Sequence, residues 1–438
     1  MKNLPFSKDY INGFAKKFGL DDLGKATIRE IVGMVNFIQE DSGVPFFRME
    51  MGVPGLNPPE VGINAEIDAL KRGVASDYPM VDGIKPLKEE ASKFIKNFIN
   101  TDIRSESCIP TVGSMQGGYA SFLMCGNIDP KKDTALFIDP GFPVQKQQFK
   151  VLNQKYESFD VYNFRGKKLR DKLETYLKNG NINSIIYSNP NNPTWVCLTD
   201  EELQIIGELA NKYDVIVIED LAYFAMDFRV DMSKPGEPPY QPSVSKYTDN
   251  YILLISSSKA FSYAGQRLAV TAISDKLFHR KYGPLRERFG ADEFGYTFVL
   301  RSIYSLSSGV SHSAQYALAA MFKAANEGKF NFVKSVREYG ERAAIMKNMF
   351  TDAGFTIVYD TDIDKPIADG FYFTISYPGM SGGELLEALI QVGISAIALD
   401  NTGSTRSEGL RACVSQIGLD KMDALQERVE LFKKINRG

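Results

Sequence analysis

Histidine is scarce in this chain of 438 residues, because only His279 and His312 are present. A Ser-His-Asp triad or a multi-histidine metal centre is therefore not expected, and we predict no metal site. The four cysteines are scattered without C-x-x-C spacing. That pattern favours free thiols in a reducing compartment over a disulfide framework or a zinc site, so we expect a cytoplasmic protein.

Long apolar runs and an excess of either charge are also missing. No stretch approaches the roughly 18 apolar residues that span a bilayer, and the N-terminus lacks the apolar core of a signal peptide. The 51 basic and 54 acidic residues are interspersed and leave a net charge of only −3. We therefore expect neither a membrane nor a nucleic acid as a partner.

The composition is that of an ordinary globular protein, with 44% hydrophobic and 24% charged residues. The chain is too long to fold around a single hydrophobic core, so more than one domain is expected. Residues 1–50 have a helical period and predict an N-terminal arm that can belong to a small domain. Between about 105 and 275, short apolar strands alternate with amphipathic helices, one of which should begin at a Thr199 capping box. This alternation predicts an α/β domain with a mostly parallel sheet over 51–310. Helices and alternating strands over 311–438 predict a smaller α+β domain.

The most informative segment runs from Ser256 through Ser-Ser-Lys-Ala-Phe-Ser-Tyr-Ala-Gly-Gln to Arg267. It follows the apolar run 251–255, and open α/β sheets place ligand groups at the carboxyl ends of strands. Lys259 can form an imine at such a position. The hydroxyls of Ser256 and Ser258, with the Arg267 guanidinium, form a donor set that suits a phosphate dianion. Taken alone, the segment also fits a solvated strand end.

Three further motifs each follow an apolar strand. Asp220 ends one of them, with Tyr223 three positions later, and a buried carboxylate needs a cationic or donor partner, such as a pyridinium nitrogen, to stay ionised. Asn192 lies in a Pro- and Asn-rich turn that can present its amide. Ser114 opens a helix, whose free N–H groups can bind phosphate. Each motif also has a purely structural explanation. Asp220 can cap the next helix, Asn192 can belong to an ordinary turn, and the segment before Ser114 can be a tight turn that needs glycine.

In their order along the chain, these motifs resemble those of the class I/II, fold-type-I pyridoxal 5′-phosphate (PLP) aminotransferases, the aspartate aminotransferase superfamily. The resemblance runs from about Gly52 to Arg411 and so covers most of the chain. It implies a fold-type-I large α/β domain with a smaller α+β domain, and PLP as the cofactor. It also implies amino acid and 2-oxo acid substrates and a homodimer with shared active sites.

The resemblance implies a role for each matching residue. Lys259 would hold PLP as a Schiff base and shuttle the proton, while Asp220 would pair with the pyridinium nitrogen. Tyr223 and Asn192 would hydrogen-bond the phenolic oxygen of the cofactor. The groups that would bind the phosphate are Ser256, Ser258, Arg267, Ser114 and the Met115 backbone.

Four other residues match shorter patterns of the family. Phe142 in Pro-Gly-Phe-Pro would stack on the cofactor ring, and Tyr78 would reach the phosphate across the dimer interface. Arg411 in Gly-Leu-Arg-Ala-Cys-Val-Ser would bind the substrate α-carboxylate, together with Asn192 and the backbone at Gly52. Without such roles, Phe142 would be a core residue, Tyr78 a surface residue and Arg411 an exposed residue of a strand.

One departure from the family concerns Trp195, the only tryptophan, which stands where glycine usually follows Asn-Pro-Thr. Tryptophan resists the positive φ that glycine permits, so the loop beyond Asn192 can differ in shape. Trp195 can simply fill a surface loop, or its indole can cover the pocket entrance and narrow it. Arg286 and Arg288 can bind a dicarboxylate from the partner subunit or be solvated helix charges, and we favour the second.

The resemblance implies transamination, but the same machinery serves other reactions. A β-eliminating C–S lyase and a cyclopropane-forming synthase differ from a transaminase only in loops that the sequence does not resolve. A non-catalytic aminotransferase-like binding protein is a further alternative. It would have little reason to keep Lys259, Asp220, Tyr223, Asn192 and Arg267 together.

Overall fold

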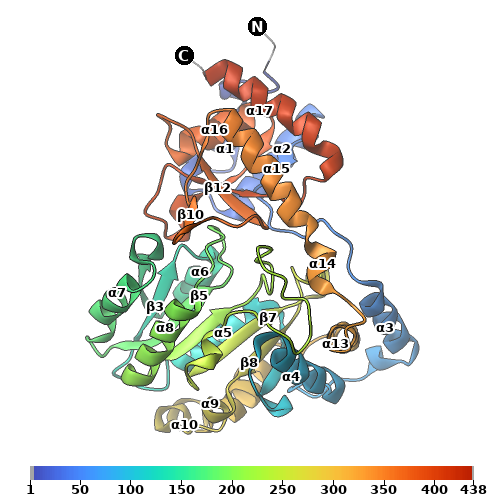
Figure 1. The fold of residues 1–438 in the computed structure, drawn as a ribbon, viewed down its shortest axis with the longest axis vertical. Coiled ribbons are helices and arrows are strands. Elements are labelled where there is room, and N and C mark those ends of the chain that lie inside the picture. Colours follow the sequence, from blue (N-terminus) through green and yellow to red (C-terminus); the bar gives the residue numbers. More distant parts are fainter. Residues whose placement is uncertain (1–3, 437–438) are drawn as a thin grey trace.

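A seven-stranded sheet organises the larger of two bodies in the computed structural model, which describes residues 4–436 (Figure 1). Its order is β2-β8-β7-β6-β5-β3-β4, and only β8 runs antiparallel to its neighbours. The predicted mostly parallel sheet is therefore confirmed. The strands are β2 (Cys108–Val112), β3 (Thr134–Asp139), β4 (Lys155–Asp160), β5 (Ile182–Ser188), β6 (Ile216–Asp220), β7 (Tyr251–Ser256) and β8 (Leu268–Ile273).

Helices cover both faces of this sheet, which explains why its strands are apolar without interruption. Alternate residues of one strand pack into different cores: Leu253 of β7 joins one cluster, while Ile252 and Leu254 join the other. The first face is covered by α4 (Lys85–Ile99), α7 (Lys168–Leu177), α8 (Asp200–Tyr213) and α13 (His312–Asn326). The second is covered by α5 (Gly113–Cys125), α6 (Pro143–Val151), α9 (Asp275–Phe278), α10 (Gly283–Phe289) and α11 (Phe294–Thr297).

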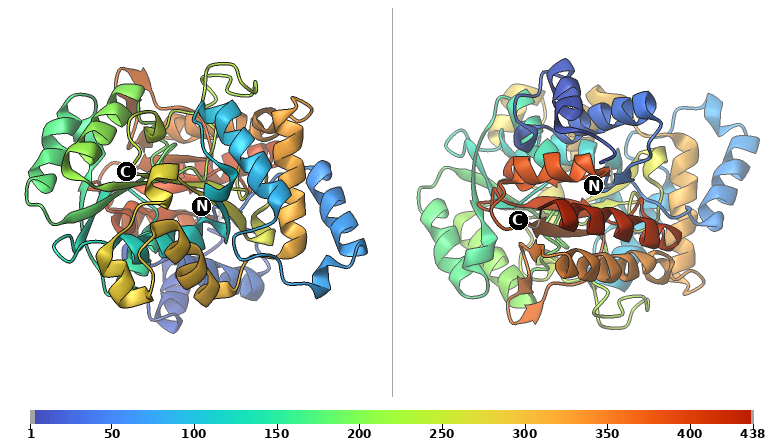
Figure 2. Two further views of the ribbon diagram at one scale, coloured as in Figure 1. Left: turned by 90° about the horizontal axis from the view of Figure 1, so that it is seen from below. Right: turned by 90° about the horizontal axis from the view of Figure 1, so that it is seen from above.

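The smaller body is built on the antiparallel sheet β14-β15-β12-β9. Its strands are β9 (Thr356–Ile357), β12 (Tyr372–Ser376), β14 (Ile397–Ala398) and β15 (Leu410–Cys413), and its helices are α15 (Glu338–Asp352), α16 (Gly382–Gln391) and α17 (Met422–Asn436). The N-terminal arm joins this body, because α1 (Lys8–Lys17) and α2 (Ile28–Ser42) share its core and β1 (Phe47–Arg48) pairs with β13 (Ile394–Ser395). Figure 2, seen from above, shows the N-terminal helices beside α16.

The chain passes between the bodies twice. After β1 it enters the large body at α3 (Glu60–Lys71), and it returns through α14 (Phe332–Val336). Helix α13 lies side by side with α3 and α4 (Figures 1 and 2). The division at residue 310 stays a prediction, and this packing favours a crossing near α14.

Local signals explain several boundaries. The predicted capping box at Thr199 is confirmed, because its Oγ1 accepts from the Glu202 N–H while Glu202 accepts from the Thr199 N–H. The π-helical turn Phe298–Ile303 leads into α12 (Tyr304–Ser307), and β10 (Thr361–Asp362) and β11 (Lys365–Pro366) form a hairpin. Over residues 4–436, no helix combines the length and apolarity needed to cross a bilayer.

Candidate active site

Three neighbouring parallel strands end at one edge of the large sheet, beneath the small body. Asp220 is the last residue of β6 and pairs in register with Ser188 at the end of β5. Ser256 ends β7, and Lys259 follows three residues later. Because parallel strands bring their carboxyl ends to the same edge, the sequence motifs converge here as predicted.

Lys259 is partly buried at this edge. Its Nζ donates to the carbonyl oxygen of Gly52 and lies 5.2 Å from the centre of the Phe371 ring. Burial lowers the pKa of Lys259 to about 8, and the positive charges of Arg411 and Arg267 act in the same direction. A neutral amine, which is the nucleophilic form, is therefore far more accessible here than on an ordinary lysine.

Asp220 is buried and has only neutral donors among the described residues. Gln145 Nε2 donates to one carboxylate oxygen at 3.1 Å, and the Ala222 N–H donates to the other at 3.1 Å. Burial raises the pKa of Asp220 to about 6, although these two hydrogen bonds oppose the rise. A cationic ring nitrogen beside this carboxylate would supply the missing charge. Gln145 is a contact that the sequence reasoning missed.

Arg411 and Asn192 meet across the two bodies. Arg411 on β15 is buried, and its guanidinium donates to Asn192 Oδ1 at 3.4 Å and to the Glu50 carbonyl at 2.6 Å. Its Nε is buried without any acceptor in the described part of the chain. An unpaired guanidinium donor is costly to bury, and a carboxylate would satisfy it bidentately. The alternative of an exposed strand arginine is therefore wrong.

Tyr223 lies against the small body as well. Its hydroxyl donates to the hydroxyl of Tyr372 at 2.9 Å, and both rings are buried. Burial raises the pKa of Tyr223 well above its ordinary value. Tyr372, on β12, was not singled out by the sequence, since a tyrosine within an alternating strand carries no distinct signal.

The predicted phosphate-binding groups surround the start of α5. Gly113 has φ +65°, a conformation that favours glycine, and a Cβ there would lie 2.7 Å from Nη2 of Arg267 and would displace the guanidinium. Ser114 and Met115 follow in the first turn of α5, where N–H groups lack helical partners. Ser256 accepts from the Ser258 N–H at 3.1 Å. The structure thus brings the Arg267 guanidinium to the start of α5, while the joint binding of a phosphate by these groups stays a prediction.

Two predicted residues stand apart. Phe142 precedes α6 and is partly buried, one turn before the Gln145 that contacts Asp220. Tyr78 is 92% exposed, and within residues 4–436 no hydrogen bond or ring contact links it to the site. A single chain does not bring Tyr78 to the other residues, so its role stays a prediction.

Trp195 corrects the sequence reasoning. It adopts φ +64°, the left-handed conformation that we expected it to resist, and it is fully buried. The indole packs against Gly370, where a Cβ would lie 1.9 Å from the ring, and its centre lies 5.3 Å from that of Tyr223. Tertiary packing therefore outweighs the local preference, and the reading of Trp195 as a surface-loop filler is wrong because the indole is fully buried. That the indole narrows the pocket stays a prediction.

Other charged groups stay outside the site. Arg286 and Arg288 are exposed on α10 and contact Asp292 at 2.5 Å and Asn127 at 3.1 Å, as solvated helix charges do.

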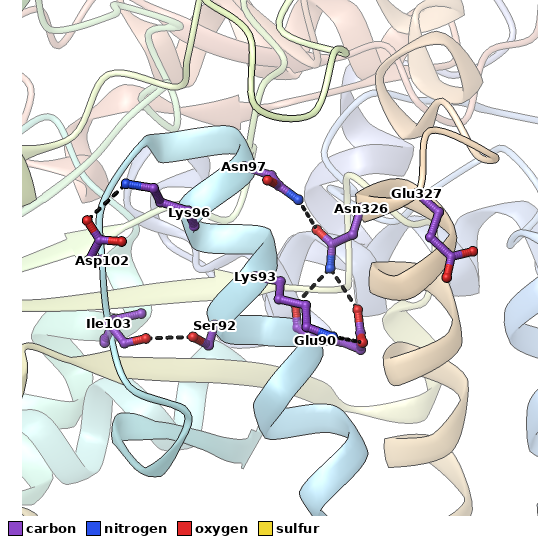
Figure 3. Close-up of a pocket in the computed structure, with 9 residues that line it drawn as sticks. All are labelled: Glu90, Ser92, Lys93, Lys96, Asn97, Asp102, Ile103, Asn326 and Glu327. Atoms are coloured by element: carbon purple, nitrogen blue, oxygen red, sulfur yellow. Dashed lines mark hydrogen bonds and ion pairs between the residues drawn. The ribbon is translucent and has the colours of Figure 1, made fainter.

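A surface hollow between α4 and α13 is drawn in Figure 3. In it, Lys93 pairs with Glu90 at 2.7 Å and Lys96 pairs with Asp102 at 2.9 Å. Because its lysines are already neutralised, this hollow is a poor ligand site beside the edge that holds Lys259.

The comparisons with known proteins agree with this geometry. The family model described as "Aminotransferase class I and II" matches residues 47–429, so the chain belongs to this family. Enzymes of the family use PLP.

Two curated relatives illustrate the sequence similarity. A probable aspartate aminotransferase of Methanocaldococcus jannaschii is 26% identical over 52% of this chain, and the match spans only 56% of that relative. The aromatic-amino-acid aminotransferase 2 of Thermococcus litoralis is 24% identical over 94% of this chain and 98% of its own length.

Solved structures show the same fold. The alanine aminotransferase of Pyrococcus furiosus has a TM-score of 0.75 at 19% identity, covering 93% of this chain and 97% of that one. The aspartate aminotransferase of Thermus thermophilus with maleate has a TM-score of 0.73 at 16% identity, covering 94% and 96%. The predicted fold-type-I architecture is confirmed.

Proposed function

We propose that this chain is a PLP-dependent aminotransferase that moves an amino group between an α-amino acid and a 2-oxo acid, with Lys259 as the attachment point of the cofactor. The observation that carries the proposal is the arrangement around Lys259. An amine with a pKa of about 8 follows β7, and a buried carboxylate ends the neighbouring strand β6. The buried Arg411, which has an unpaired donor, is close enough to lower the pKa of that amine. Family membership supports the same reaction class.

The residues present fit PLP. Asp220 would hold the ring nitrogen, Tyr223 and Asn192 would donate to the phenolic oxygen, and Phe142 would lie on the ring. Gly113 leaves room at the mouth of the phosphate-binding groups, where a Cβ would collide with Arg267. When bound, PLP supplies an electron sink that stabilises negative charge at the substrate Cα.

Residues of the chain itself would orient the substrate and transfer the proton. Arg411 binds the substrate α-carboxylate and thereby orients the Cα–H bond, while the Glu50 carbonyl and Asn192 hold the guanidinium in place. Lys259 Nζ would be the nearby base that takes the Cα proton and passes it on to the cofactor instead of returning it to Cα, which is what transamination requires. Asp220 stays ionised and keeps the ring nitrogen protonated.

We also propose a homodimer. Apolar side chains are exposed on α3, namely Val61, Ile67 and Leu70, and on α12, namely Tyr304 and Leu306. The exposed Tyr78 and Met80 lie on the loop that joins α3 to α4. Tyr78 shares a hollow with residues 307–313, next to α12. A second chain that covers this surface would carry Tyr78 to the partner's phosphate-binding groups. Sedimentation equilibrium should then give twice the 48.9 kDa of one chain.

A cytoplasmic location is part of the proposal. It is supported by the four cysteines, which are all free thiols, three of them buried.

An absorbance titration tests the proposed function. The purified protein, loaded with PLP, should show the cofactor's visible band, and adding amino acids one at a time should shift that band for true donors only. Aspartate, alanine and aromatic amino acids are the first to try. Ammonia release with loss of the amino acid's side chain would instead indicate a lyase, and no band after adding PLP would contradict the proposal.

Arg411→Gln is the matched variant for this titration. It should keep the cofactor band but respond to amino acids only at about 10- to 100-fold higher concentrations, because a charged hydrogen-bonded pair with the carboxylate is lost.

A further inference from the structure

Tyr372 holds a place in the site that neither the motifs nor the expected roles assign. It lies on β12 of the small body, and its hydroxyl is 2.9 Å from the hydroxyl of Tyr223. We propose that Tyr372 is a positioning residue for the reaction, whose hydroxyl holds the Tyr223 hydroxyl at the phenolic oxygen of the cofactor and strengthens its hydrogen bond there. This inference rests on the proposed function.

The Tyr372 side chain is held in place on several sides. A Cβ at Gly52 would lie 2.2 Å from its hydroxyl oxygen, so the absence of a side chain at Gly52 makes room for this hydroxyl. The Arg411 guanidinium lies 4.6 Å from the centre of the Tyr372 ring. Trp195 packs edge-on against both tyrosines, 5.3 Å from Tyr223 and 6.3 Å from Tyr372. The two hydroxyls therefore have little freedom to separate.

Hydroxyl chemistry explains why the contact matters. Each tyrosine hydroxyl has one hydrogen to donate and lone pairs to accept. Tyr223 donates to Tyr372 in the structure, and when Tyr223 turns its hydrogen to the phenolic oxygen of the cofactor, Tyr372 can donate to Tyr223 in return. A phenol that accepts a hydrogen bond is a stronger donor, because consecutive hydrogen bonds polarise one another.

The proposal predicts a shift in the titration of the bound cofactor. Donation from Tyr223 stabilises negative charge on the phenolic oxygen, so a weaker donor lets the bound chromophore keep its proton to higher pH. In Tyr372→Phe the proton affinity of the chromophore should rise about three- to tenfold, the usual range for one hydrogen bond. The amount of bound cofactor should not change.

The experiment is a pH titration of the visible absorbance of the PLP-loaded protein. Tyr377→Phe is the matched control, because Tyr377 follows the same strand but packs on Phe355 and Phe432, away from Tyr223. The midpoint should rise in Tyr372→Phe and stay at the wild-type value in Tyr377→Phe. In a Tyr223→Phe background, Tyr372→Phe should cause no further shift, because Tyr372 acts through Tyr223.

The possible failures are distinguishable. A wild-type protein with a normal band and a Tyr372→Phe midpoint that does not move would overturn the role of Tyr372 alone. A further shift in the Tyr223→Phe background would overturn it too, since Tyr372 would then act directly. A wild-type protein that shows no band after PLP is added would overturn the proposed function together with this role.

Discussion

At the scale of single residues, the environment of Asp220 decides what the site can bind. Two neutral donors, from Gln145 and the Ala222 backbone, are not enough to offset burial, so the pKa of this carboxyl is about 6. Above that pH the carboxylate is ionised and attracts a protonated ring nitrogen. Below it the carboxyl is neutral, and the attraction is lost.

The affinity for PLP should therefore fall as the pH drops through about 6. Asp220→Asn should bind PLP at least about tenfold more weakly near neutral pH, because a hydrogen bond to a charged group is lost, and should lack the wild-type step. Equilibrium dialysis of the cofactor-free protein over a pH series measures both effects.

Glu219→Gln is the control for this experiment. Glu219 is the neighbouring buried carboxyl, with a pKa of about 7, but it contacts Tyr187 and Ser243 instead of the site. In Glu219→Gln the affinity for PLP should fall near pH 6 as it does in the wild-type protein. If the affinity also falls near pH 6 in Asp220→Asn, a group other than Asp220 is responsible.

Single residues also mark the limit of what the sequence predicts. Lys259, Asp220 and Asn192 were found because each follows an apolar strand, and their order is typical of the family. Gln145 and Trp195 were missed or misjudged, because a glutamine in an amphipathic helix carries no signal and the burial of Trp195 depends on Gly370, 175 positions away. Contacts of that separation are set by tertiary packing.

At the scale of elements, the β10–β11 hairpin fastens the small body to the large one. Asp362 on β10 binds Arg165 at 2.7 Å and Arg229 at 2.8 Å, and it also accepts from the Cys197 N–H at 3.3 Å. Arg165 in turn binds Glu202 of α8 through two contacts of 2.7 and 2.9 Å. Through Asp362, the hairpin thus contacts the loop that carries Trp195 and Asn192.

Asp362→Asn should lower the free energy of unfolding by about 3 kcal/mol, because it leaves the buried guanidinium of Arg165 short of its partner. Urea unfolding followed by circular dichroism measures the change. Asp364→Asn, an exposed position in the same hairpin, should change stability little. Equal losses in both variants would show that the hairpin itself, and not the ion pairs, stabilises the contact.

The elements themselves were the most predictable level. The strands and the α8 capping box were confirmed, since apolar runs and caps are local signals. In the small body, the alternating segments that begin at Gly370 and Gly409 were confirmed as β12 and β15. The two-residue strands β9 and β14, and the pairing of β1 with β13 over more than 340 positions, were not predicted, because so short a strand leaves almost no pattern.

At the scale of the whole molecule, the site exists only where the two bodies meet. Lys259, Asp220 and Tyr223 come from the large body, whereas Arg411 and Tyr372 come from β15 and β12 of the small one. Figure 1 shows β12 above the large sheet. The Gly52 segment, which crosses between the bodies, supplies the carbonyl that contacts Lys259. Cofactor attachment and carboxylate binding are thus assigned to separate bodies, and their relative position sets the geometry of the reaction.

The most direct test of this account is to find where the cofactor is attached. The PLP-loaded protein is reduced with borohydride, digested with a protease, and analysed by mass spectrometry. The account predicts one modified lysine, Lys259, and no modified peptide in Lys259→Ala treated in the same way. Modification of another lysine in the wild-type protein, or of none, would contradict it.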